Sequence, residues 1–173
     1  MNGNRIFTVS EVRECEKFTM QKEQISSIEL MERAGCACAE VIAPGIWFDE
    51  YEDVYVYVGT GNNGGDGVVI AVHLAEECSD RTVNVVVCAP EGARYSEEMQ
   101  YQLKRWQSFV SQHDNAKIIY YSLDNQPEPK KNDLIVDALF GIGLNKPVTG
   151  FYADVIRHIN ASEAFVIAID TPS

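Results

Sequence analysis

Short apolar runs alternate along the chain with longer segments in which apolar residues recur every three or four positions. The apolar runs predict five strands, at 54–58, 83–88, 117–121, 134–140 and 165–169. The segments between them predict helices with one apolar face, as in the stripe formed by Val68, Ala71, Val72 and Ala75. This alternation predicts an α/β fold with a mainly parallel sheet and helices on both faces.

Two further helices precede the first predicted strand and form an N-terminal helical extension. Thr8 or Ser10 can cap the first of them. Ser26, with Glu29 three residues later, matches a capping box and predicts a second helix over 28–43, ended by the following Pro-Gly pair. Because these helices have no strand of their own to cover, we expect them to contribute to a homodimer interface.

Length and charge limit the class of protein. With 173 residues, 46% of them hydrophobic, the chain is long enough for one well-buried domain. The net charge of -12 argues against nucleic acid or an anionic membrane as a partner, since both require a basic surface. A phosphate-bearing ligand would therefore be held locally, by helix amides, a few basic side chains or a bound cation.

Cysteines and histidines give no metal-binding pattern in the sequence. The five cysteines have neither zinc nor thioredoxin spacing, and we expect buried thiols in a reducing compartment. His73, His113 and His158 are isolated, and we expect none of them to have a carboxylate nearby. No apolar run approaches the ~20 residues of a membrane span, and the first residues lack a signal-peptide core, so we expect a cytoplasmic protein.

The first predicted strand runs into a loop rich in glycine, between Gly59 and Gly67, and then into a helix. Glycines allow close backbone approach, and the free N–H groups at a helix start attract phosphate. Asn62, Asn63 and Asp66 add amides and a carboxylate that a plain phosphate loop does not need. This loop is therefore predicted to do more than hold phosphate.

Two other strand exits carry polar residues that a parallel sheet brings to the same edge. Asp137 lies inside an apolar strand, where an unpartnered carboxylate costs several kcal/mol. It can bind a cation with the oxygens of Asn63 and Ser173, or accept backbone N–H groups from the 141–143 loop. Asp170, at the end of the fifth strand, is placed for proton transfer, or alternatively caps a turn.

The spacing of Gly59, Gly61 and Gly64 matches the dinucleotide-binding pattern Gly-x-Gly-x-x-Gly. A dehydrogenase also needs an acidic residue at the end of its second strand to hold the ribose. Here that strand ends Val87-Cys88-Ala89-Pro90. The acidic residue that would support a hydride-transferring dehydrogenase is therefore missing from the expected position.

Three motifs on three strand exits resemble those of the NAD(P)HX epimerase family, also called the YjeF N-terminal domain. They are Asn-Asn-Gly-Gly-Asp-Gly at 62–67, Val-Asp-Ala-Leu-Phe-Gly-Ile-Gly-Leu at 136–144 and Ile-Asp-Thr-Pro-Ser at 169–173. The resemblance covers residue 8 to the end and implies a Rossmann-like three-layer sandwich, usually dimeric. It implies an isomerase of nicotinamide nucleotide repair that interconverts the R and S epimers of hydrated NADH or NADPH.

The resemblance also implies site residues. The acid/base carboxylate is Asp170, and a potassium ion, one per subunit, is held by Asn63, Asp137 and Ser173. The substrate-binding residues that it implies are Asn62, Asn63, Gly64, Gly65, Asp66, Gly141, Ile142, Gly143, Leu144, Asn145, Lys146, Pro147 and Asp170.

The family motif continues beyond Pro-Ser, so we expect the single domain at 1–173 to be truncated at its C-terminus, and a dehydratase to be a fused or separate partner. Inverting a carbon that bears a hydroxyl needs a proton donor and acceptor, whether by loss and return of water or by ring opening. The alternative interpretation is a non-catalytic Rossmann-like module that binds a nucleotide or a protein.

Overall fold

A single parallel sheet forms the centre of the computed structural model, which describes residues 7–43 and 51–173. Within these residues the sheet has five strands in the order β3-β2-β1-β4-β5. The strands are β1 (Val54–Val58), β2 (Val83–Val87), β3 (Ala116–Tyr120), β4 (Leu134–Ala138) and β5 (Phe165–Ala168). The helices are α1 (Val9–Glu23), α2 (Ser27–Ile42), α3 (Asn62–Glu77), α4 (Glu97–Val110) and α5 (Phe151–Ala161). The predicted α/β Rossmann-like fold is confirmed.

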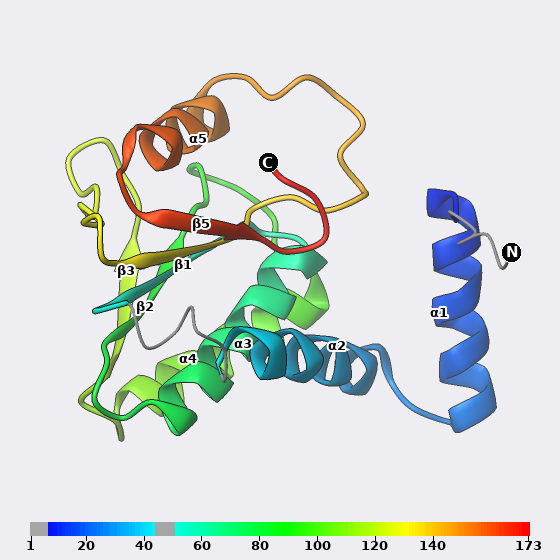
Figure 1. Ribbon diagram of the computed structural model, residues 1–173. Helices are drawn as coiled ribbons and strands as arrows, with labels where there is room; N and C mark the ends of the chain where they lie inside the picture. The colour runs from blue at the N-terminus through cyan, green and yellow to red at the C-terminus, as the bar shows by residue number, and fades with distance from the viewer. Residues whose placement is uncertain (1–6, 44–50) are drawn as a thin grey trace, which may run out of the picture.

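Helices cover both faces of the sheet (Figure 1). α3 and α4 lie on one face and α5 on the other, and α2 packs outside α3. Alternate residues of β1 enter different cores: Val56 is buried on the α3 side, and Tyr57 is buried on the α5 side. The strands are apolar throughout because both of their faces are buried.

The predicted helix starts are also confirmed. Thr8 caps α1 and Ser26 caps α2, each in a capping box with the glutamate three residues later. α2 ends at Ile42, and the helix stop expected at Pro44-Gly45 lies outside the described residues. β4 is shorter than predicted, because the Leu139 N–H donates to the Asp137 carboxylate (3.1 Å) as the chain leaves the sheet.

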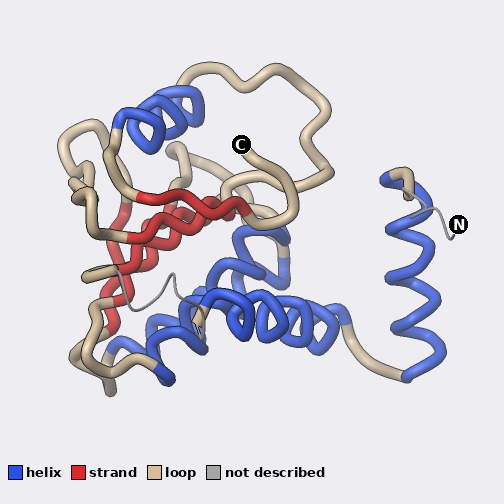
Figure 2. The backbone as a smooth tube through the Cα atoms, viewed as in Figure 1, coloured by secondary structure: helices blue, strands red, loops and turns tan. Residues whose placement is uncertain are grey.

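α1 stands beside the rest of the domain (Figure 2), and each of its residues is exposed or half-buried. It bears exposed apolar side chains, including Phe18 at 63% exposure. The predicted dimer interface on the N-terminal helices stays a prediction. Among the described residues, no helix is both long and apolar enough to cross a membrane.

The strand order changes direction between β1 and β4. From β1 the chain moves to β2 and β3, and then crosses back to β4 and β5. At such a point the connections leave the sheet in opposite directions and open a crevice at the carboxyl ends of the strands. Gly59 allows the segment after β1 to lie directly against the segment after β4. A Cβ on this residue would lie 2.1 Å from the Leu139 carbonyl oxygen.

α2 and α3 approach closely at Gly35, where a Cβ would lie 2.5 Å from Cγ1 of Val69. This approach corrects the expectation that His73 has no nearby carboxylate. Its Nε2 atom lies 3.4 Å from Oε1 of Glu32 and 2.8 Å from Sγ of Cys36. Residues 37 positions or more apart are brought together here by helix packing, which spacing along the sequence does not reveal.

We expect Gly35→Ala to lower the free energy of unfolding by about 1–3 kcal/mol, because the added methyl overpacks the contact with Val69. Urea denaturation measures the change. Gly143→Ala is the matched control, since its Cβ would meet only the end of Arg13, at 3.9 Å, and should change stability by less than about 0.5 kcal/mol. Equal stabilities for the two variants would contradict the close approach.

Candidate active site

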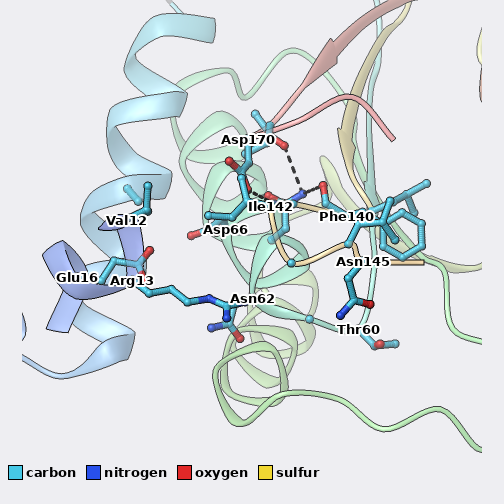
Figure 3. Close-up of a pocket in the computed structure, with 18 of the residues that line it drawn as sticks. Val12, Arg13, Glu16, Thr60, Asn62, Asp66, Phe140, Ile142, Asn145 and Asp170 are labelled. Atoms are coloured by element: carbon cyan, nitrogen blue, oxygen red, sulfur yellow. Dashed lines mark hydrogen bonds between the residues drawn. The ribbon is translucent and has the colours of Figure 1, made fainter. Parts of the chain in front are cut away.

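A cleft of about 750 Å³ lies at the carboxyl ends of β1, β4 and β5. One side is formed by the start of α3, another by the loop after β4, and a third by residues of α1 and α2 (Figure 3). Its position is the one predicted from the strand order. The three strand exits that carry the sequence motifs therefore meet in one place.

Most of the predicted substrate-binding residues line this cleft. They are Asn62, Asn63, Asp66, Gly141, Ile142, Gly143, Leu144, Asn145, Lys146 and Asp170. Gly64 and Gly65 are buried in the first turn of α3, where added Cβ atoms would meet the Gly59 carbonyl and the Met31 side chain. Pro147 follows the lining loop, so a role in binding stays a prediction for these three residues.

Asp170 is held in a backbone conformation that few residues other than glycine adopt. Its φ is +67°, and aspartate is one of the residues that tolerates this region. Its exposed carboxylate accepts a hydrogen bond from the Ile142 N–H (2.7 Å). A Cβ on Gly141 would lie 2.3 Å from the same carboxylate, so a larger residue there would displace it. These contacts fix the carboxylate at the cleft wall.

Asp66 faces the same cleft from α3 and is half-buried. Burial, together with the charges of Asp170 and Glu16, raises the pKa of Asp66 to about 7. At neutral pH this carboxyl is therefore protonated in a large fraction of molecules. A carboxyl that carries a proton beside another carboxylate is typical of acid–base sites.

The Asn63 carboxamide connects the three strand exits. Its Nδ2 donates to the carbonyl of Phe140 (2.7 Å) and to the carbonyl of Ile169 (3.3 Å), beyond β4 and β5. Its Oδ1 is buried and has no hydrogen-bond partner among the described residues. A buried acceptor without a donor is costly, which points to a ligand outside the protein chain.

Asp137 and Ser173 form hydrogen bonds with each other next to the Phe140 N–H, whereas Asn63 binds the Phe140 carbonyl. The Ser173 N–H and hydroxyl donate to the Asp137 carboxylate at 3.0 and 2.9 Å, and the Phe140 N–H donates to Ser173 Oγ at 3.3 Å. Asp137 thus accepts backbone N–H groups, as the structural alternative requires. The donors are Leu139 and Ser173, however, and not the predicted 141–143 loop, whose Ile142 N–H binds Asp170.

This donor set fits a hard monovalent or divalent cation. Its candidate ligands are the unpartnered Asn63 oxygen, the Asp137 carboxylate and the Ser173 hydroxyl, all of them oxygens. The three residues are linked through the Phe140 backbone. Cation binding by these residues stays a proposal.

Sequence reasoning missed cleft residues that come from outside the motifs. Arg13 and Glu16 of α1 point toward the cleft (Figure 3), and Ala34 and Cys38 of α2 line it as well. Tyr152, at the start of α5, lines the cleft too. Nothing in the local pattern marks them, because their position depends on how α1, α2 and α5 pack around the sheet edge.

Fold and site together define a Rossmann-like α/β protein with a nucleotide-sized cleft at the strand switch point. A family model described as YjeF-related protein N-terminus matches residues 27–173. The chain belongs to this family, as its three motifs predicted.

Named relatives extend the comparison. The chain is 37% identical over 172 residues to the NAD(P)H-hydrate epimerase of Limosilactobacillus fermentum, covering 96% of this chain and 73% of the relative. It is 32% identical over 169 residues to the bifunctional NAD(P)H-hydrate repair enzyme Nnr of Thermofilum pendens, covering 98% of this chain and 31% of that protein. The crystal structure of yeast ynu0, YNL200c, shares the fold with a TM-score of 0.71 at 20% identity, covering 98% of this chain and 71% of that chain.

The raised pKa of Asp66 predicts how stability changes with pH. The folded state holds the proton up to about pH 7, whereas an unfolded aspartate loses it near pH 3.9. This contribution to the free energy of unfolding is therefore full below about pH 4 and is lost as the pH rises to about 7.

We expect Asp66→Asn to gain stability relative to the wild type across this window, by less than the about 1.4 kcal/mol per pH unit of one fully coupled proton. Urea denaturation at pH 4, 5.5 and 7 gives the difference between the two proteins. Asp124→Asn, in an exposed loop, should run parallel to the wild type. A difference between Asp66→Asn and wild type that stays constant with pH would show that Asp66 has an ordinary pKa.

Proposed function

We propose that this chain is an NAD(P)H-hydrate epimerase, an isomerase that interconverts the R and S epimers of hydrated NADH and NADPH. The observation that carries the proposal is the pairing of Asp66 and Asp170 in one cleft beside the N-terminus of α3. The names of the curated relatives support the same activity. The nucleotide is then the substrate and not a cofactor.

The reaction needs two proton transfers at the carbon that bears the hydroxyl. If the hydroxyl departs as water, an acid must donate a proton to it, and a base must take a proton from the water that returns on the other face. Ring opening and closing also needs one donor and one acceptor. The proton taken up in one half of the reaction is returned in the other, so the reaction as a whole neither consumes nor releases protons.

Asp66 and Asp170 supply these two roles. Asp66, with its pKa raised to about 7, is the proton donor, and the Asp170 carboxylate is the proton acceptor. The Ile142 N–H holds the Asp170 carboxylate in place, and the left-handed backbone conformation of Asp170 keeps this carboxylate at the cleft wall. Positioning two groups on rigid elements lowers the entropic part of the barrier.

Phosphate recognition falls to the start of α3 and to basic side chains. α3 begins at Asn62 without a side-chain cap, so its first N–H groups are available to an anion. Arg13 and Lys146 add positive charge on two other sides of the cleft. Local groups of this kind offset the net charge of -12.

A potassium ion bound by Asn63, Asp137 and Ser173 completes the proposal. When bound, the ion would supply a fixed positive charge behind the phosphate-binding loop and a partner for the Asn63 oxygen. The protein's own contacts support the placement, since these three residues are already joined through the Phe140 backbone.

Membership of this family also suggests two partners, a dehydratase and a second copy of the chain. The Thermofilum pendens relative is bifunctional, and this chain covers 31% of it, so a fused or separate dehydratase that consumes one epimer is the natural partner activity. The homodimer inferred from the resemblance would use the N-terminal helices, whose apolar residues include the exposed Phe18.

We expect Asp170→Asn to lower kcat on the order of 10²–10⁴-fold, because the amide cannot accept a proton, while NADHX binding changes little. Chromatographic separation of the epimers gives the rate, and calorimetric titration with NADHX gives the affinity. Asp124→Asn is the control and should keep full activity. If affinity and kcat/KM fell together with kcat unchanged, Asp170 would be a substrate-positioning residue instead.

We expect replacement of sodium by potassium chloride, at equal ionic strength, to raise Tm by about 2–4 °C, which corresponds to about 1 kcal/mol in a domain of this size. Asn63→Ala should remove the difference between the two salts, whatever its own Tm, because it deletes one oxygen ligand. Equal melting of the wild type in both salts would contradict a potassium site.

A further inference from the structure

A second group of chemically reactive side chains lies outside the cleft, between α2 and α3. Cys36 Sγ is 2.8 Å from His73 Nε2, and the same nitrogen is 3.4 Å from Glu32 Oε1. One ligand atom from each of these three residues lies within 4.8 Å of the other two. A thiol, an imidazole and a carboxylate are the three ligand types that zinc takes from proteins.

The fold brings these residues together by helix packing. Glu32 and Cys36 are four residues apart and therefore share one face of α2. The close approach of the two helices at Gly35 places that face against His73 of α3. All three residues lie on helices and not on loops, so their backbone positions are fixed relative to one another.

Neighbouring residues hold two of the candidate ligands in place. Arg105 of α4 donates to both oxygens of Glu32, at 2.7 and 2.6 Å. The second ring nitrogen of His73, Nδ1, faces the Glu76 carboxylate at 3.9 Å. A histidine that donates to a carboxylate from one nitrogen and binds zinc through the other is a common arrangement, and a small rotation of Glu76 would complete it here.

Charge and access also favour a cation. Glu40 lies near the Cys36 thiol and Glu76 near His73, so two further carboxylates flank the cluster. Of the nearby guanidinium groups, Arg105 is paired with Glu32 and Arg33 with Glu23. Glu32, Cys36 and Glu40 line a surface hollow of about 410 Å³. An ion can enter from this hollow, and water can occupy a fourth position.

We propose that Glu32, Cys36 and His73 form a binding site for a zinc ion that joins α2 to α3. Zinc bonds of about 2.0–2.3 Å require ligand atoms roughly 3.3–3.6 Å apart. The His73–Glu32 distance of 3.4 Å already fits, and the Cys36–His73 distance of 2.8 Å has to lengthen by less than an ångström. Coordination would displace the thiol proton. The site is separate from the substrate cleft, and it stands or falls independently of the epimerase activity.

The competing interpretation is that the cluster is complete without metal. A thiol–imidazole hydrogen bond and an Arg105–Glu32 ion pair would then only stabilise the packing of the helices. In that case the protein shows no saturable zinc binding, and Cys36 reacts like the other partly exposed thiols.

The test uses the untagged full chain after treatment with a chelator. Zinc chloride is titrated against a competing chromophoric chelator, and cobalt chloride provides a spectroscopic probe of thiolate coordination. We expect one zinc per chain, a weakening of at least about tenfold in both Cys36→Ser and His73→Ala, and a thiolate-to-cobalt band that Cys36→Ser lacks. Cys38→Ser, two residues along the same helix, should keep the band and the affinity. Loss of binding in Cys38→Ser but not in Cys36→Ser would overturn the assignment.

A measurement on the wild type alone covers the case in which a variant does not fold. Alkylation with iodoacetamide, followed by peptide mapping, gives the reactivity of each cysteine with and without zinc chloride. We expect zinc to slow the alkylation of Cys36 at least about tenfold and to leave Cys15 and Cys38 unchanged. Equal rates at Cys36 with and without zinc would refute the site.

Discussion

The contact between the start of α3 and the exits of β4 and β5 holds the site together. Asn63 donates to carbonyls beyond both strands, and Gly59 lies directly against the Leu139 carbonyl. Without these contacts the start of α3 would lose its connection to the other two motifs, which Asp170 and Ser173 already join to each other. Because backbone carbonyls are the acceptors, the geometry depends on Asn63 and on the glycines more than on the other side chains of the loops.

The same contact explains why the pKa of Asp66 is raised. Joining the strand exits places Asp66 and Asp170 in one cleft, and α1 brings Glu16 toward them. Burial, and after it the charges of Asp170 and Glu16, raise the pKa of Asp66, which lies half-buried near the start of α3. This crowding of carboxyl groups costs stability, and such a cost is typical of functional sites.

Sequence patterns predicted the sheet, the helix caps and the residues at the strand exits, because each depends on local periodicity or on a short motif. Asp170 and Asn63 could be placed at one edge because all strands are parallel. Arg13 and Tyr152 could not be found, since they reach the cleft only through the packing of α1 and α5. The cluster of Cys36 and His73 was also beyond the sequence, because Gly35 reads as an ordinary helix residue until its contact with Val69 is seen.

Incubation of the protein with chemically prepared R-NADHX in potassium buffer tests the central claim most directly, with chromatography following the appearance of the S epimer. The acid–base pair of Asp66 and Asp170 predicts conversion until the two epimers reach equilibrium. The folded protein binding NADHX without any conversion, beside an active relative assayed under the same conditions, would contradict the claim and leave a binding module.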